Sequence, residues 1–252
     1  MIYKKNIFDV GAFNGLDGLI MALKNPEVMV HAFEANPELI KVIKNNKKKI
    51  ENYKKIKIKN YKINNFAVSN KDKVLEFNIA KNPTVSSLNK FSKNIDKTWP
   101  GYKDEHCTFK KKIKIKGVTL NKYCNENNIK KINYLHIDTQ GNDLKVLLGL
   151  KNKIKIVEKG VMEAAINKKK SLYQNNHTVS EAQKFLKKNN FHITKIEFLD
   201  KTIKNEKNIF FENKVANLSK IKNKYNLRYY NRIINNKLNL KDKIIDKIRH
   251  FF

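Results

Sequence analysis

The sequence predicts an α/β fold of the doubly wound type, with a mostly parallel seven-stranded sheet and a C-terminal helical extension. Apolar runs of strand length alternate with longer helical patterns, as is typical of βαβ units around a parallel sheet. A turn with two glycines follows the first run, and an acidic residue follows the second. Both lie at the strand ends where such sheets bind ligands.

The expected strands of the parallel sheet cover residues 5–10, 28–34, 61–68, 133–138 and 156–163, each apolar enough to be buried on both faces. Helices are expected over 16–24, 37–49, 118–127, 142–150 and 178–189. Strands over 191–198 and 208–212 would close the sheet with an antiparallel edge. A hairpin of 74–80 with 113–116 flanks a polar insertion, residues 81–112, which is the candidate lid over a substrate.

Residues 1–213 are therefore expected to form one domain, and residues 214–252 a basic helical extension. Leu227, Tyr230 and Ile234 recur at helical spacing, and the apolar residues of 244–252 do so again. Three alternatives stay open for this extension. It packs on the domain or on a second copy of the chain, it lies on a membrane surface, or it binds nucleic acid.

The composition is strongly basic, with 54 Lys and Arg against 23 Asp and Glu and a net charge of +31. Such a charge favours anionic partners such as nucleic acid. The excess is nearly all Lys, spread along the chain together with abundant Asn and Ile, so part of it is typical of an AT-rich coding sequence. Two distant cysteines, no membrane-length apolar run and no leader pattern predict a cytoplasmic protein without a metal site.

The first motif, D-x-G-x-x-x-G, runs from Asp9 to Gly15. A dinucleotide site would use G-x-G-x-x-G at this turn, and Asp9 would repel a phosphate. The carboxylate instead suits a ligand with an ammonium group. A plain strand-to-helix turn is the alternative. The candidate cofactor-binding residues here are Asp9, Gly11, Ala12, Asn14 and Gly15.

The second motif places Glu34 at the end of the second expected strand, where a carboxylate can accept hydrogen bonds from both hydroxyls of a ribose. Glu34 could instead cap the next helix, but Asn36 before Pro37 is the better cap. We therefore nominate Glu34, Ala35 and Asn36 for the cofactor. Together, the two motifs predict a nucleoside cofactor with a cationic tail.

The chain resembles the FkbM family of methyltransferases over about residues 6–213. Besides the two motifs, the resemblance rests on Asn65-Phe-Ala67-Val-Ser69, Ser86-Ser87-Leu88, Gly117-Val-Thr-Leu-Asn121 and the block from Leu135 to Gly149, followed by Glu163 and Leu172-Tyr173. It implies a Rossmann-like class I methyltransferase fold and methyl transfer from S-adenosylmethionine, commonly to a hydroxyl of a sugar or natural product. It also implies that Asn65, Ala67 and Ser69 lie near the adenine.

Two departures from the family pattern stand out. The family often has D-V-E-G where this chain has Asp138-Thr-Gln-Gly141, which replaces a charge by an amide. The chain also begins almost directly at its first expected strand.

Asp138 is the main catalytic candidate, because it ends a central strand and would enter the ligand crevice. It also lies toward the amino acid end of the cofactor. His136 shares its strand face and is the candidate base. Both could instead be satisfied core groups. Since methyl transfer from a sulfonium is one in-line displacement, positioning can supply most of the acceleration. The candidate substrate residues are Ser86, Ser87, Gln140, Asn142, Glu163 and Tyr173.

The acceptor atom is expected to be an oxygen of a small molecule or glycan. No Pro-Cys dipeptide is present for a cysteine adduct, and no Asn-Pro-Pro-aromatic run for amino methylation of a base. A nucleic-acid methyltransferase, a nicotinamide-dependent oxidoreductase and a binding module without activity are the alternatives. The missing G-x-G-x-x-G counts against the oxidoreductase.

Overall fold

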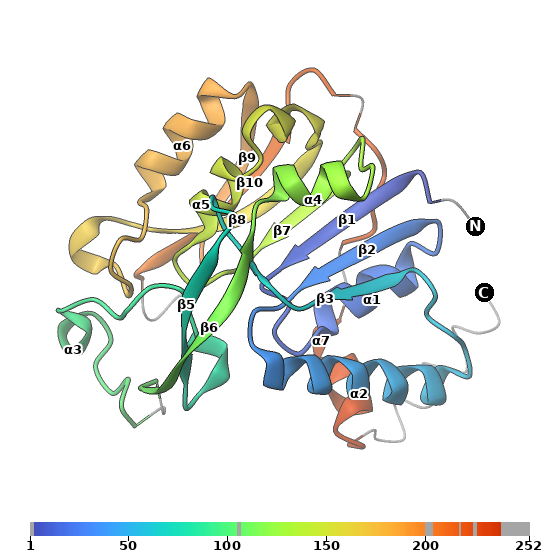
Figure 1. Ribbon diagram of the computed structural model, residues 1–252, viewed down its shortest axis with the longest axis horizontal. Helices are drawn as coiled ribbons and strands as arrows, with labels where there is room; N and C mark the ends of the chain where they lie inside the picture. Colours follow the sequence, from blue (N-terminus) through green and yellow to red (C-terminus); the bar gives the residue numbers. More distant parts are fainter. Residues whose placement is uncertain (1–2, 105–106, 200–203, 217, 224–225, 238–252) are drawn as a thin grey trace.

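The computed structural model describes residues 3–104, 107–199, 204–216, 218–223 and 226–237. Its main sheet has seven strands in the order β3-β2-β1-β7-β8-β10-β9 (Figure 1). The strands are β1 (Lys5–Val10), β2 (Val28–Phe33), β3 (Tyr61–Asn64), β7 (Tyr134–Ile137), β8 (Lys159–Ala165), β9 (Phe191–Phe198) and β10 (Glu206–Asn213). The first five pair in parallel, and β10 is antiparallel to β8 and β9. The expected seven-stranded sheet with its antiparallel edge is confirmed.

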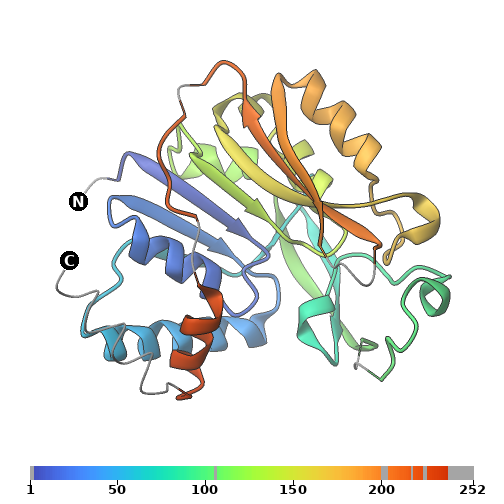
Figure 2. The same cartoon turned by 180° about the vertical axis from the view of Figure 1, so that it is seen from behind.

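Helices cover both faces of this sheet. On one face lie α1 (Leu16–Lys24), α2 (Pro37–Lys54) and α7 (Leu227–Ile234), and on the other α4 (Leu120–Glu126), α5 (Asp143–Leu148) and α6 (Val179–Lys188) (Figures 1 and 2). Strand alternation divides β1 between the two layers, because Ile7 packs with α1 while Phe8 and Val10 pack with α4 and α5. No helix in the described ranges is long and apolar enough to cross a bilayer.

A second, three-stranded sheet has the order β4-β6-β5 and is built from β4 (Ala67–Val68), β5 (Val74–Ala80) and β6 (Phe109–Val118). Its hairpin of β5 and β6 leans away from the main sheet (Figure 1). The expected single strand over 61–68 is therefore wrong. The chain leaves the main sheet after Asn64, because the Asn65 side chain donates to the carbonyls of Glu34 and Ala35 and β4 then pairs with β6.

The expected insertion, residues 81–112, begins after β5 and includes the first residues of β6. Between the strands lie η1 (Pro83–Val85) and the short α3 (Ile95–Thr98). Further on, η2 (Lys151–Ile156) and η3 (Lys168–Lys170) flank β8.

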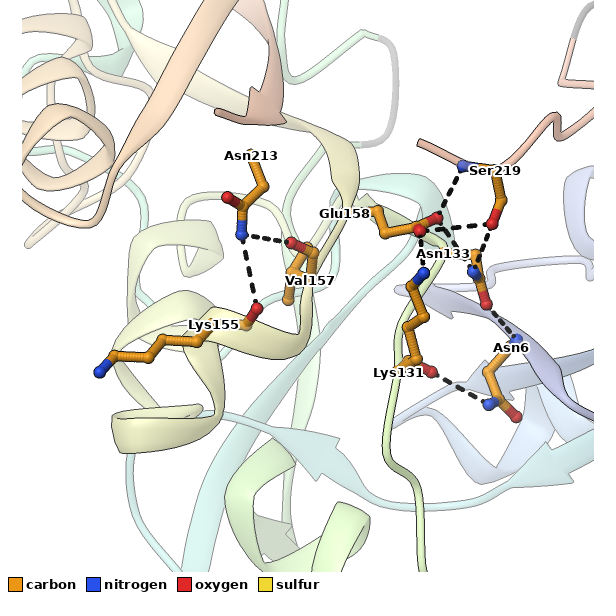
Figure 3. A network of polar contacts seen from close by, with 8 residues as sticks. All are labelled: Asn6, Lys131, Asn133, Lys155, Val157, Glu158, Asn213 and Ser219. Carbon is orange, nitrogen blue, oxygen red and sulfur yellow. Dashed lines mark hydrogen bonds and ion pairs between the residues drawn. The ribbon is translucent and has the colours of Figure 1, made fainter. Parts of the chain in front are cut away.

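The C-terminal extension differs from the expected continuous helix. Residues 214–216 and 218–223 contain no helix, and α7 starts only at Leu227. The buried Glu158 explains this course, because its carboxylate accepts hydrogen bonds from the backbone N–H of Ser219 at 3.1 Å and from Asn133 Nδ2 at 2.9 Å (Figure 3). Lys131 forms an ion pair with the same carboxylate. The expected helical residues of 244–252 lie outside the described ranges.

The extension then packs on α1 and α2. Lys222 N donates to Asn25 Oδ1 at 2.9 Å, and Asn25 Nδ2 donates back to Lys222 O at 3.2 Å. Tyr229 and Ile233 of α7 are buried in the same cluster as the apolar faces of α1 and α2. Ile221 and α7 therefore contribute to the core on one face of the sheet, where Figure 2 shows α7 beside α1 and α2.

Candidate functional site

A cavity lies beyond the carboxyl ends of β1, β2 and β7, between the main sheet and the three-stranded sheet. It holds about 960 Å³ of space, open solvent at its mouth included. Open α/β sheets bind their ligands at this position. Of the described residues, four carboxylate side chains line it, those of Asp9, Asp17, Glu34 and Asp138, whereas no described Lys or Arg does.

The turn after β1 approaches β7 closely. Gly11 has φ +89°, and a Cβ there would lie 1.7 Å from the carbonyl oxygen of Asp138. Gly11 N and Ala12 N both donate to the Phe33 carbonyl, at 3.0 and 2.9 Å, which ties the turn to the end of β2. Only glycine permits this approach at this φ.

Glu34 connects the turn after β1 with the start of α2. Its Oε2 accepts the backbone N–H of Phe13 and its Oε1 that of Asn36, both at 2.7 Å. Burial raises the pKa of Glu34 to about 7, against the opposing effect of these two hydrogen bonds. Each oxygen keeps a second lone pair, so the carboxylate can accept two further hydrogen bonds.

Asp9 and His136 are partners in the parallel register of β1 and β7. His136 Nδ1 donates to Asp9 Oδ1 at 2.8 Å, while Asp9 Oδ2 is buried and has no hydrogen-bond partner among the described residues. Burial lowers the pKa of His136, but the bond to Asp9 and the charges of Asp9, Asp17 and Asp138 outweigh it and raise the pKa to about 9. The imidazole is therefore protonated at neutral pH.

Asp138 follows β7 and is held by the loop after it. Gln140, with φ +54°, donates from Nε2 to Asp138 Oδ1 at 2.7 Å, and Gln140 Oε1 lies 2.9 Å from the Tyr173 hydroxyl. Ser87 Oγ donates to the Gln140 carbonyl at 2.6 Å. Burial raises the pKa of Asp138, whereas the charge of His136 lowers it, and the net direction is upward. Ser87 and Tyr173 thus support the loop that presents Asp138.

Asp143 also holds the loop that follows β7. Its Oδ1 accepts the backbone N–H and the hydroxyl of Thr139, and its Oδ2 accepts the backbone N–H of Glu163 at 2.8 Å. Burial raises the pKa of Asp143 to about 7 and that of Glu163 well above its usual range. Across the described ranges, no group of three or more His, Cys, Asp or Glu is arranged to hold a metal ion.

The structure brings most of the nominated residues to the cavity. Those that line it are Asp9, Gly11, Ala12, Glu34, Ala35, Ala67, Ser86, His136, Asp138, Gln140 and Asn142. The nominated residues that lie behind this wall are Asn14, Gly15, Asn36, Asn65, Ser69, Ser87, Glu163 and Tyr173. Asn14 Oδ1, for example, accepts Leu16 N at 3.0 Å, and Asn36 caps α2. The roles assigned to all of them stay predictions.

Two groups of lining residues were missed. Asp17, in the first turn of α1, adds a carboxylate beside Asp9 and His136. Phe66, inside a motif whose neighbours were nominated, adds an aromatic wall together with Leu39 and Phe77. The position of Asp17 at the N-terminus of an expected helix was the available signal for the first group. The others depend on how the two sheets face each other, which no local pattern reveals.

Comparisons with known proteins also indicate the FkbM family. The model of the methyltransferase FkbM domain family matches residues 9–193. Among solved structures, methyltransferase FkbM from Methylobacillus flagellatus KT is similar at 11% identity and a TM-score of 0.48, covering 82% of this chain and 43% of that one. The chain thus spans less than half the length of that protein. A comparison with curated proteins finds no match.

Two further structures are similar at the level of the fold. M. capricolum TrmK in complex with S-adenosyl-homocysteine has 13% identity and a TM-score of 0.47, covering 100% of this chain and 92% of that one. Aeropyrum pernix fibrillarin with bound S-adenosyl-L-methionine has 8% identity and a TM-score of 0.43, covering 83% and 66%. Because the family model matches most of its length, the chain belongs to the methyltransferase FkbM domain family, which confirms the family expected from its motifs.

Proposed function

We propose that the cavity binds S-adenosylmethionine and that the chain transfers its methyl group to a hydroxyl of a small-molecule or glycan acceptor. The charge of the cavity wall is the observation that carries this proposal. In a chain with 54 Lys and Arg, the part of the wall that the structure describes holds four carboxylates and no Lys or Arg. Such a wall attracts a ligand with sulfonium and ammonium groups and repels the pyrophosphate of a dinucleotide.

The lining residues match the parts of this cofactor. Glu34 can accept both ribose hydroxyls on its remaining lone pairs, and Phe66, Ala67 and Val68 offer an apolar wall to the adenine. Asp9 and Asp17 suit the ammonium group. The buried, unpartnered Oδ2 of Asp9 supports a cationic ligand beside it.

The bound cofactor would supply an electrophilic methyl group on a sulfonium. Asp138 would receive the proton that the acceptor hydroxyl loses as its oxygen forms the new C–O bond, because burial raises the pKa of this carboxyl. Gln140 holds Asp138 Oδ1 at 2.7 Å and so fixes its direction. Ser86, Pro83 and Thr84 of the insertion line the same cavity and would exclude water from it.

Titration calorimetry with S-adenosylhomocysteine and with NAD⁺ tests the cofactor assignment. We expect saturable binding of the first and no heat from the second. Transfer of a tritiated methyl group to sugars, nucleotide sugars and total RNA then tests the acceptor. Binding of NAD⁺ in preference to S-adenosylhomocysteine would refute the proposal.

RNA is the second candidate acceptor, since one surface groove favours a polyanion. Lys90, Lys110 and Lys112 line this groove beside Phe91 and Phe109, whose rings stack at 4.3 Å. Phe91 and Phe109 are partly buried, and lysines beside aromatic rings are typical of single-stranded nucleic-acid sites. Under this alternative RNA affinity falls steeply with salt, whereas a small-molecule methyltransferase shows little salt dependence.

A further inference from the structure

His136 presents one free edge to the cavity. Its Nδ1 is bound to Asp9 Oδ1 at 2.8 Å, and 28% of its side chain is exposed, against 1% for Asp9. The described residues offer no hydrogen-bond partner to Nε2, the other ring nitrogen, although His136 lines the cavity. The imidazole is therefore held at Nδ1 and keeps one ring nitrogen available at the cavity wall.

Carboxylates from three elements surround this ring. Asp9 faces it from β1, Asp17 from α1 and Asp138 from the loop that follows β7, and all three charges favour the imidazolium form. Because no Lys or Arg of the described residues lines the cavity, His136 is the only side chain in the described lining that carries a positive charge.

The amino acid end of S-adenosylmethionine carries a carboxylate as well as an ammonium group. Asp9 and Asp17 suit the ammonium, but their charges and that of Asp138 would repel the carboxylate. Offsetting this repulsion calls for a hydrogen-bond donor at the same end as the aspartates, and a cationic donor forms the stronger bond. His136 meets this requirement, since it lies directly beside Asp9 in the sheet register.

We propose that His136 is a cofactor-positioning residue, whose Nε2–H would donate a charge-assisted hydrogen bond to the carboxylate of the cofactor's amino acid end. This inference rests on the proposed function of the cavity. It replaces the role of base expected from the sequence, because an imidazolium already holds the proton that a base would accept. The proton of the acceptor hydroxyl is then left to Asp138.

The arrangement also predicts ligand selectivity. A nucleoside thioether that keeps the amino group but lacks the carboxylate would leave His136 unpaired in an acidic cavity. The carboxylate of S-adenosylhomocysteine should therefore strengthen binding by roughly 10- to 100-fold, as expected for one charge-assisted hydrogen bond.

Titration calorimetry of two ligands on four proteins tests the proposal. The ligands are S-adenosylhomocysteine and its decarboxylated analogue, S-adenosyl-3-thiopropylamine. The proteins are the full chain, His136→Gln, His136→Lys and the control His192→Gln on the exposed part of β9. Gln keeps a donor for Asp9 but loses the charge, whereas Lys restores the charge.

We expect His136→Gln to weaken S-adenosylhomocysteine by roughly 10- to 100-fold and the analogue by less than about threefold. His136→Lys should recover most of the difference, and His192→Gln should change neither ligand. Equal weakening of both ligands, or unchanged affinity for S-adenosylhomocysteine in His136→Gln, would overturn the proposal. If the unsubstituted chain binds the analogue as tightly as S-adenosylhomocysteine, this inference fails while the proposed function stands. If it binds neither ligand, both fail.

Discussion

Replacing Glu34 tests its predicted contact with the ribose of the cofactor. The carboxylate already accepts two backbone N–H groups, at 2.7 Å each, and would accept two ribose hydroxyls as well. A charge-assisted hydrogen bond contributes about 1.5–3 kcal/mol, and imperfect geometry reduces the sum of two. We therefore expect Glu34→Ala to lose about 2–4 kcal/mol of affinity for S-adenosylhomocysteine, a factor of roughly 30 to 900 in Kd.

The pH dependence sharpens this prediction. Because the pKa of Glu34 is about 7 before the ligand binds, ionising it costs binding energy below that pH. Affinity should stay constant above pH 7 and weaken below it, by up to about tenfold per pH unit. Glu34→Gln cannot titrate and should lose this part of the profile.

The raised pKa of Glu34 also makes the stability of the ligand-free protein depend on pH. A carboxyl whose pKa is raised on folding, from 4.5 to about 7, binds its proton more tightly in the folded state. The contribution of Glu34 to the free energy of unfolding is therefore highest at low pH, and it falls by about 3 kcal/mol as the pH rises from 4.5 to 7. Glu34→Gln should remove this fall in the free energy of unfolding of the ligand-free protein.

Calorimetric titrations between pH 5.5 and 8.5 measure the first two effects, and urea unfolding over the range from 4.5 to 7 measures the third. Glu38→Gln is the matched control, because Glu38 is an exposed carboxylate in the first turn of α2 that pairs with Lys111 at 2.6 Å and does not line the cavity. A change below about threefold in Kd for Glu34→Ala would refute the ribose assignment.

Three further predictions follow from single contacts. Gly11→Ala should abolish ligand binding and lower the free energy of unfolding by about 3 kcal/mol or more, since its Cβ would lie 1.7 Å from the Asp138 carbonyl oxygen. Gly101→Ala, with similar φ but no heavy atom nearer than 3.9 Å, should cost only about 1 kcal/mol in urea unfolding. Glu158→Ala should destabilise the protein by about 2–4 kcal/mol, because Lys131 and Ser219 lose a buried acceptor; an unchanged thermal midpoint would contradict this. Asp138→Asn should lower methyl transfer at least about 100-fold while calorimetry shows nearly unchanged S-adenosylhomocysteine affinity, and a larger loss in binding than in turnover would count against its role as proton acceptor.

Local patterns predicted the parts of the site that follow directly from strand ends. Asp9, Glu34 and Asp138 each end a buried strand of a parallel sheet, so their common location follows from the alternation of strands and helices alone. The register partnership of Asp9 and His136 also follows from neighbouring parallel strands. Local patterns do not show which of the two groups holds the proton, because the pKa of His136 depends on the charges of Asp9, Asp17 and Asp138 together.

Other features depend on tertiary packing that local patterns do not contain. The run 61–68 has the length of one strand and contains five apolar or aromatic residues, yet the chain changes sheets at Asn65, whose side chain binds the loop after β2. Tyr173 and Ser87 belong to the resemblance with the family but lie behind the cavity wall, where they hold the backbone and side chain of Gln140. The extension reads as helical, yet Glu158 binds the backbone at Ser219 and so fixes a non-helical course there.

A crystal structure of the chain with S-adenosylhomocysteine would test the account most directly. We expect the ribose hydroxyls on Glu34, the adenine against Phe66, and the amino acid end between Asp9 and His136, with the His136 Nε2 on the carboxylate. A ligand bound elsewhere, or bound in this cavity with its amino acid end away from β1 and β7, would contradict it.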